Sequence, residues 1–162
     1  AYQLGFSYKD IILSKDILNF EYSWADHRIY RNKIELNNYY SHGYPLGLWS
    51  GPHSEVFQST YEFLLKKYKF QVSYLFSKRG ELTDQMLELA YNKEYYNRYS
   101  NNHEQKSIVS FLINNKITKH IESGIQYKFI DWSNAGFNPI NSEIVYDDIV
   151  KHSINFNISY TY

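Results

Sequence analysis

The sequence predicts an all-β fold and, within that class, an antiparallel transmembrane β-barrel. Three observations support the prediction. Seven segments alternate apolar and polar residues at period two, which is how a strand separates its two faces. The connections between them are alternately short and long, and most segments reach the ~9–11 residues that a tilted strand needs to cross a bilayer. The predicted strands are residues 2–13, 17–25, 55–66, 68–77, 104–114, 116–130 and 150–162.

The first four predicted strands carry aromatic and aliphatic side chains on one face and polar side chains on the other. Their apolar positions are Leu4, Phe6, Tyr8 and Ile12, then Leu18, Phe20, Tyr22 and Trp24, then Phe57, Tyr61, Phe63 and Leu65, then Tyr68, Phe70, Val72, Tyr74 and Phe76. The polar positions include Glu21, Glu62 and Lys69. Charges of both signs in mid-strand are expected for a polar barrel lumen.

The last three predicted strands repeat the scheme, although Ile108 and Leu112 interrupt the polar face of the fifth. The apolar positions are Val109, Phe111 and Ile113, then Ile117, Ile121, Ile125, Tyr127 and Phe129, then Ile154, Phe156, Ile158, Tyr160 and Tyr162. The sixth strand also places Glu122 and Lys128 on its polar face. The final strand resembles the C-terminal signal strand of outer-membrane proteins, because it ends on an aromatic residue.

The connections predict which end of the barrel faces outward. Tight turns are expected at Ser14–Asp16, Lys66–Lys67 and Asn114–Lys116, where Asn and Asp tolerate left-handed backbone. Long loops cover 26–54, 78–103 and 131–149, as on the outer face of a membrane barrel. Within the second loop, Leu82, Met86 and Leu89 followed by Lys93 and Tyr96 have helical spacing and predict a short helix over the barrel mouth.

The amino-acid composition limits the classes of partner and of site that we expect for the protein. The 162 residues contain 17 basic and 17 acidic side chains, so charge balance does not indicate nucleic acid. The absence of cysteine excludes a disulfide scaffold and a thiolate metal site. Aromatic residues make up 19% of the chain, with 18 tyrosines, which favours strands and membrane interfaces.

We expect residues 1–162 to form one domain that is the C-terminal part of a larger barrel. The sequence opens inside a predicted strand, and single-chain bacterial barrels close with even strand numbers rather than seven. The expected location is the bacterial outer membrane, and the expected neighbours are outer-membrane lipid, the rest of the barrel N-terminal to Ala1 and other envelope proteins.

The segment from Gly43 to Ser54 is the part of the chain that is richest in glycine and proline. Gly43, Gly47, Gly51, Pro45 and Pro52 force a defined loop path. Its glycine spacing does not match a phosphate-binding loop. Two interpretations stay open: Tyr44, Trp49 and His53 stack on a sugar ring, or the loop braces the barrel mouth.

The residues Tyr39–Gly47, followed by Gly51–Pro52 and a strand near Val56, resemble the capsule assembly protein Wzi family. Leu48 and His53 depart from the family pattern. The resemblance implies a barrel of about 18 strands. It also implies a lectin-like, non-enzymatic role in holding capsular polysaccharide at the cell surface. The matching positions Gly43, Gly47, Gly51 and Pro52 are expected to shape the loop.

The expected partner is therefore extracellular polysaccharide, with no catalytic residue, metal or cofactor. The candidate carbohydrate-binding residues are Tyr44, Trp49, His53, Tyr95, Tyr96, Arg98 and Trp132. His120 with Glu122 is interpreted as a luminal charge pair. Asp147, Asp148 and His152 are interpreted as a solvated loop rather than a metal site.

Three other functions stay open. The first alternative is an outer-membrane pore or secretion-system barrel, whose luminal charges would set permeability. The second is an outer-membrane enzyme that uses residues at the barrel rim. The third is a soluble lipocalin-like binder, since alternation alone does not say which face of a barrel points inward.

Overall fold

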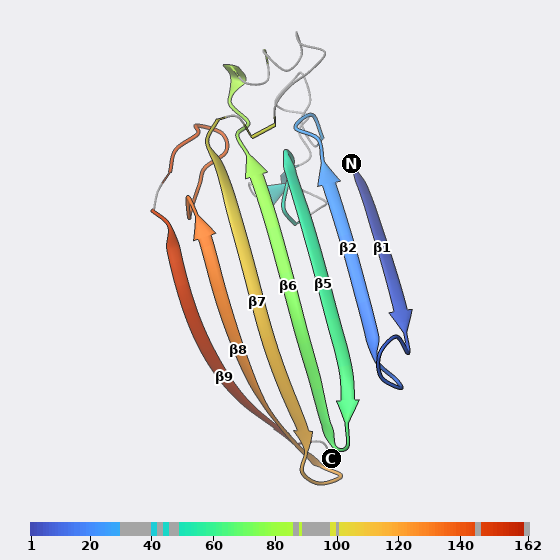
Figure 1. Cartoon of the computed structure of the whole chain (residues 1–162). Coiled ribbons are helices and arrows are strands. Elements are labelled where there is room, and N and C mark those ends of the chain that lie inside the picture. The colour runs from blue at the N-terminus through green and yellow to red at the C-terminus, as the bar shows by residue number, and fades with distance from the viewer. Residues whose placement is uncertain are drawn as a thin grey trace.

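The computed structural model describes residues 1–29, 40–41, 44–45, 49–85, 88, 98–99, 101–144 and 147–160. It contains one antiparallel seven-stranded sheet in the order β1-β2-β5-β6-β7-β8-β9 (Figure 1). A separate two-stranded sheet pairs β3 and β4. The strands are β1 (Tyr2–Lys9), β2 (Ile17–Ala25), β3 (Tyr40–Ser41), β4 (Tyr44–Pro45), β5 (Ser54–Leu65), β6 (Tyr68–Gly80), β7 (His103–Lys116), β8 (Ile121–Ser133) and β9 (Ile149–Tyr160).

The all-β prediction is confirmed, and each strand of the large sheet pairs with the next large strand along the chain. Short turns lie at one end of the sheet and long connections at the other, as the sequence predicted (Figure 1). No described helix is long and apolar enough to cross a membrane. Asp84 and Gln85 have helical backbone, and most of the helix predicted after them lies outside the described residues.

Two predicted strand boundaries are wrong by four residues or more, because local hydrogen bonds turn the chain earlier or later than the apolar pattern suggests. The first strand ends at Lys9 rather than at residue 13, and the carboxylate of Asp16 then binds the backbone of the turn. The sixth begins at Ile121 rather than at residue 116, because the carbonyl of Ile121 accepts from Ile117 and Thr118. His120 therefore lies in a turn, not on a strand face beside Glu122.

The strand register places most of the apolar residues of the seven strands on one side of the sheet, here called the apolar face; Leu75, Ile108 and Ile130 are exceptions that lie together on the other side. One row across it runs through Tyr8, Leu18, Tyr61, Val72, Phe111, Tyr127 and Ile154. The opposite side, here called the polar face, has a row through Ser7, Asn19, Thr60, Ser73, Ser110, Lys128 and Ser153. The alternation in sequence thus becomes a separation of two surfaces.

The apolar face is open rather than covered. Phe156, for example, is 75% exposed. Among the described residues, the buried hydrophobic side chains are few and gather near the loop end: Ala25, Val56, Leu82, Ala135 and Phe137. The large sheet therefore has no interior core along most of its length.

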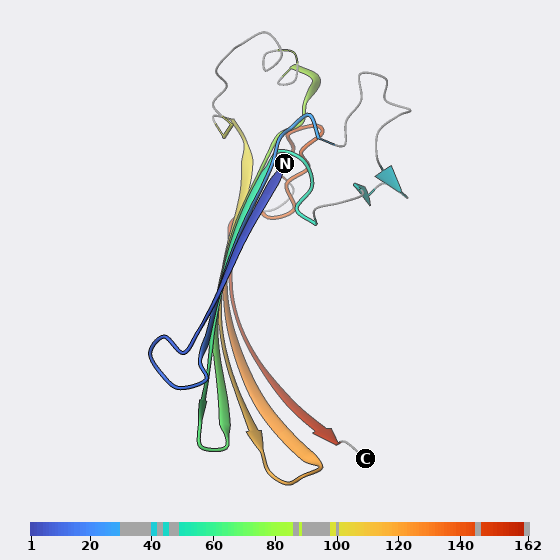
Figure 2. The same cartoon turned by 90° about the vertical axis from the view of Figure 1, so that its right-hand side faces the viewer.

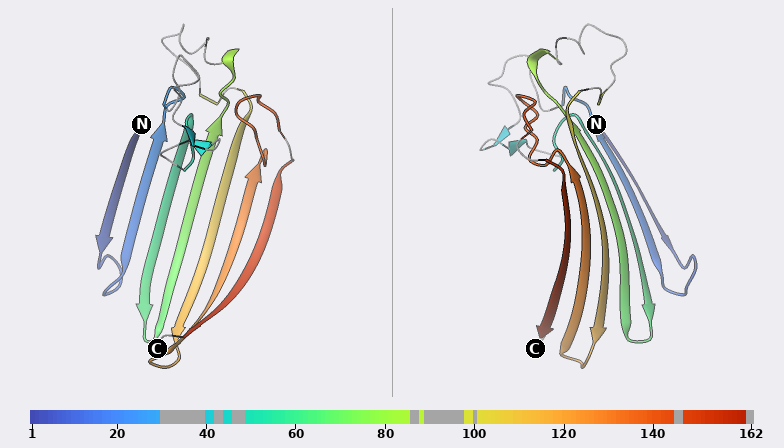
Figure 3. Two further views of the ribbon diagram at one scale, coloured as in Figure 1. Left: turned by 180° about the vertical axis from the view of Figure 1, so that it is seen from behind. Right: turned by 60° about the vertical axis from the view of Figure 1, so that its left-hand side comes forward.

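The sheet is twisted and bent, and β1 and β9 form its two edges (Figure 2). In Figure 2 the connection 134–144 lies on the side toward which β8 and β9 bend. This is the polar side, because the Arg79 guanidinium on the polar face donates to the Phe137 carbonyl at 2.9 Å. Figure 3 shows the described part of the connection 134–144 at the same end of the sheet from two further sides.

Candidate functional site at the loop end

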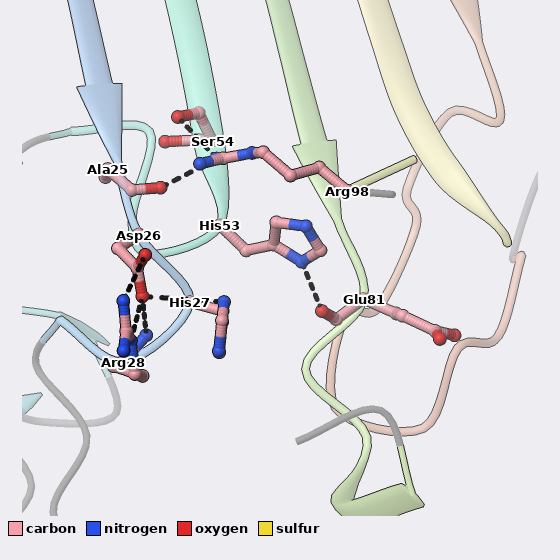
Figure 4. Close-up of polar contacts among 8 residues, drawn as sticks. All are labelled: Ala25, Asp26, His27, Arg28, His53, Ser54, Glu81 and Arg98. Atoms are coloured by element: carbon pink, nitrogen blue, oxygen red, sulfur yellow. Dashed lines mark hydrogen bonds and ion pairs between the residues drawn. The ribbon is translucent and has the colours of Figure 1, made fainter. Parts of the chain in front are cut away.

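The candidate site lies where β2 ends, β5 begins and β6 ends. Register pairs Ala25 with Ser54, and Ser54 with Arg79, so these three strand ends are neighbours. Side chains from the long connections gather on them (Figure 4). We call the group Asp26, His27, His53, Arg98 and Tyr99 the rim cluster.

Arg98 joins two strand ends from a connection far along the chain. Its guanidinium donates to the carbonyl of Ala25 at 2.8 Å and to that of Ser54 at 3.2 Å (Figure 4). The same group lies over the ring of Trp24, 4.3 Å from its centroid, and 5.5 Å from that of Tyr99. Arg98, which was predicted to contact sugar, is therefore held by backbone carbonyls and aromatic rings.

His53 is fully buried in the rim cluster. Its Nδ1 lies 2.6 Å from the carbonyl oxygen of Glu81, and its ring stacks on Tyr99 with centroids 5.5 Å apart. The His53 carbonyl also accepts from the amide of Gly80 at 2.8 Å. The His53 ring is therefore enclosed by protein and is not at the surface, where it could stack on a sugar.

Burial also sets the charge of the rim cluster. It lowers the pKa of His53 to about 4, and the nearby Arg98 guanidinium acts in the same direction. Burial likewise lowers the pKa of His27. Burial opposes the charged form of Asp26, but hydrogen bonds from the Arg28 side chain and amide hold its carboxyl pKa well below the usual value. The cluster thus combines neutral imidazoles with a closed Asp26–Arg28 ion pair.

Trp132 belongs to a second group on the polar face. Its indole N–H donates to Glu104 Oε1 at 2.7 Å, and Glu104 Oε2 lies 2.9 Å from the Arg79 guanidinium. The Lys106 ammonium sits 3.9 Å from the Trp132 ring centroid. Trp132 was predicted to contact sugar, but one face of its ring already contacts Lys106 and its indole N–H is already bonded to Glu104.

Glu81 is a structural residue that sequence reasoning missed. Its buried carboxylate accepts from Asn101 Nδ2 at 2.7 Å and from Ser142 Oγ at 2.9 Å. The following residue, Leu82, donates its amide to the carbonyl of Pro139 at 2.6 Å. These contacts bind the end of β6 to connections 20 and 61 residues away along the chain. No local spacing could have indicated such partners.

Among the predicted site residues whose exposure the structure describes, Trp49 is the most accessible, at 66% exposed. The loop after it is closed: Ser54 Oγ lies 2.8 Å from Ser50 Oγ and donates to the Gly51 carbonyl at 2.7 Å. Gly51 has a positive φ of 75°, which suits glycine, and Pro52 is buried. Trp49 therefore stands on a defined base.

The remaining predicted residues are not brought to the rim cluster by anything the structure describes. Tyr44 and Pro45 lie in β4, where the backbone alone is described. Tyr95, Tyr96, Gly43 and Gly47 lie outside the described residues. The structure thus assigns Arg98, His53 and Trp132 to internal contacts and leaves Trp49 at the surface.

The described residues contain no group of three or more His, Asp or Glu side chains placed to hold a metal ion. Asp148 accepts from the amide of Asn134, whereas His152 contacts the hydroxyl of Tyr127. No protein-family model, curated protein or solved structure matches the chain. The resemblance to the capsule assembly family therefore stays a prediction.

Replacement of Gly80 tests how tightly the rim cluster is packed. A Cβ on Gly80 would occupy the space of the His53 ring, which is buried and held by Glu81. We expect Gly80→Ala to lower the free energy of unfolding by about 1–3 kcal/mol. Gly5→Ala is the matched control, because its Cβ would meet only the Phe20 carbonyl at 3.5 Å and should change stability by less than about 0.5 kcal/mol. Equal melting temperatures of the two purified variants would contradict this packing.

The buried His53 predicts acid sensitivity. Its folded pKa of about 4 lies below the ordinary value, so the unfolded chain binds a proton at higher pH than the folded chain. Stability is then full above about pH 6.5 and falls as the pH decreases toward 4, by up to about 3 kcal/mol. His53→Asn removes this titration and should flatten the pH dependence of the melting temperature. An unchanged slope in the variant would exclude His53 as a source of the effect.

Proposed function

We propose that this chain forms part of the wall of a bacterial outer-membrane β-barrel and that its loop end binds extracellular polysaccharide at the cell surface. The observation that carries the proposal is the uncovered apolar face of seven adjacent strands. Soluble monomers rarely expose apolar patches larger than a few hundred Å². Contact with lipid would remove this face from water without any covering layer of protein.

The distribution of charge on the apolar face supports a membrane boundary. Along the seven large strands, charged residues on this face occur only near the loop end, at Glu55, Lys78 and Asp131. Glu55 and Leu65 are ten residues apart on β5. At about 3.3 Å per residue and a tilt of about 40°, this distance gives a height of about 25 Å, which is the apolar band of an outer-membrane barrel.

Aromatic residues occur along the whole apolar face, and tyrosine or tryptophan stands at both of its ends. Tyr2, Tyr22 and Trp24 lie toward the loop end, and Tyr8, Tyr68 and Tyr160 toward the turn end. Membrane barrels carry such girdles at the two lipid–water interfaces, because tyrosine and tryptophan have an apolar body and a polar tip. The two groups therefore support the same boundaries as the charges.

The polar face has the properties of a barrel lumen. Lys69 pairs with Glu62 at 2.8 Å across neighbouring strands, and Gln3 donates to Glu21 at 2.8 Å. Near the loop end, the connection 134–144 crosses this face and is fixed by Arg79. A connection folded over this face would narrow a lumen near its mouth, which suits a surface-binding barrel better than an open pore.

Polysaccharide binding is proposed from Trp49 and from the resemblance of Tyr39–Gly47 and Gly51–Pro52 to the capsule assembly family. An aromatic ring on a defined base offers a flat apolar surface for the apolar face of a sugar ring. The rim cluster would then act as the support of that surface, because it fixes the loop from within.

The lipid contact is tested by a lysine substituted on each face of the sheet, at similar distances from its two ends. Phe111 lies on the apolar face of β7 and Gln126 on the polar face of the adjacent β8. We expect Phe111→Lys to destabilise the membrane-inserted protein by about 2–4 kcal/mol and Gln126→Lys to have little effect. Folding into lipid vesicles and detergent extraction from membranes measure this difference. Recovery of the wild-type protein in the soluble fraction without detergent would refute the membrane assignment.

The polysaccharide contact is tested at Trp49. Removal of a stacking ring worth about 1.4 kcal/mol weakens binding about tenfold, so we expect Trp49→Ala to reduce polysaccharide retention on cells by that factor. Ile140→Ala is the control, because Ile140 is also 66% exposed and lies in another loop-end connection. Both variants should be present in the membrane at wild-type levels. Equal retention by the two variants would remove Trp49 from the binding surface.

A further inference from the structure

The turn between β1 and β2, residues 10–16, presents three consecutive apolar side chains to solvent. Ile11, Ile12 and Leu13 are 49%, 76% and 41% exposed. Polar and glycine residues are the usual occupants of such turns, so an apolar tip requires a reason. We call Ile11–Leu13 the apolar tip.

One buried carboxylate holds the apolar tip in place. Asp16 Oδ1 accepts from the amide of Ile11 at 2.7 Å, and Asp16 Oδ2 accepts from those of Ile12 and Leu13, each at 2.9 Å. The hydroxyl of Tyr61 also donates to Asp16 Oδ2, at 2.7 Å. Asp16 itself is fully buried in the turn. The backbone donors of all three exposed residues are therefore satisfied within the turn.

A turn that leaves water needs a hydrogen-bond acceptor for its backbone amides. An amide that enters lipid without a hydrogen-bond partner costs several kcal/mol, which excludes most irregular backbone from membranes. The amide of Lys15 is also used, since it donates to Asp10 Oδ1 at 2.5 Å, and the amide of Asp10 donates to the Asp16 carbonyl at 3.0 Å. The turn thus presents apolar side chains outward while the amides beneath them have acceptors inside the turn.

The turn lies on the side of the apolar face. Tyr61, which contacts Asp16, belongs to that face. In Figure 2 the turn leaves the sheet on the side opposite to the connection 134–144, which covers the polar face. The apolar tip therefore extends the apolar face beyond the ends of the strands.

Basic residues lie near the apolar tip. Lys15 follows it in the turn, and Lys66 and Lys67 form the neighbouring turn at the same end of the sheet; all three are exposed. An apolar segment near lysines complements a phospholipid leaflet, whose acyl chains lie beneath phosphate groups.

We infer that the turn 10–16 is a membrane anchor, in which Ile11, Ile12 and Leu13 insert into the leaflet at the turn end and the adjacent lysines bind anionic phospholipid headgroups. This inference rests on the proposed membrane wall. It adds a contact with lipid outside the strands and assigns Asp16 the role of positioning it.

The absence of cysteine allows a direct test with a single reporter. Ile12→Cys is labelled with an environment-sensitive fluorophore in the full protein, reconstituted into phosphatidylcholine–phosphatidylglycerol vesicles. Lys119→Cys, in the exposed β7–β8 turn at the same end, is the matched control, and Ile125→Cys reports on the apolar face itself. We expect nitroxide-labelled lipid to quench the Ile12 probe several-fold more strongly than the Lys119 probe.

The three probes separate the anchor from the wall. Lipid quenching at Ile125, with quenching at Ile12 by aqueous iodide instead of lipid, would overturn the anchor and leave the wall intact. Iodide quenching at both positions would overturn both proposals. Protection of the Ile12 probe that depends on protein concentration would assign the tip to a contact between protein copies and overturn the anchor. Weaker Ile12 lipid quenching in Asp16→Asn, with Ile125 unchanged, would support the positioning role of Asp16.

Discussion

The hydrogen bonds between neighbouring strands are the interaction on which the rest of this structure depends. They fix a register in which every second residue of seven strands falls on the same surface. A slip of one residue in any pair would move that strand's apolar side chains to the polar side. The row through Tyr61, Val72 and Phe111 shows the result, because three strands contribute apolar residues at one level.

The two ends of the sheet are organised by different means. At the turn end, most contacts are local: Asp16 closes one turn, and Thr118 accepts from His120 and Ile121 in another. At the loop end, long-range side-chain contacts do this work. Arg98, His53 and Glu81 each contact residues more than ten positions away. The base of the binding surface proposed at Trp49 therefore depends on packing at a distance.

The sequence predicts the sheet well and the loop end poorly, for a physical reason. Alternation is a local property of the sequence, so it predicts the strands and the alternation of short turns and long loops directly. It failed where apolar residues continued past a strand end, as at Ile11–Leu13, because the Asp16 carboxylate competes with strand pairing for their amides. It also could not anticipate that His53 is buried, since its partner carbonyl, that of Glu81, is 28 residues away.

The position of the few buried hydrophobic residues has a consequence for how the protein acquires its structure. Val56, Leu82 and Phe137 are buried at the loop end, whereas the strands below them have no interior to collapse around. In water, both faces of the described sheet stay exposed to solvent. Folding alone therefore removes little apolar surface from water and gains little free energy. If the wall is embedded in lipid, transfer out of water supplies the free energy that a core supplies elsewhere. Folding and insertion would then be one thermodynamic event, and the chain would need shielding by another component until it reaches the membrane.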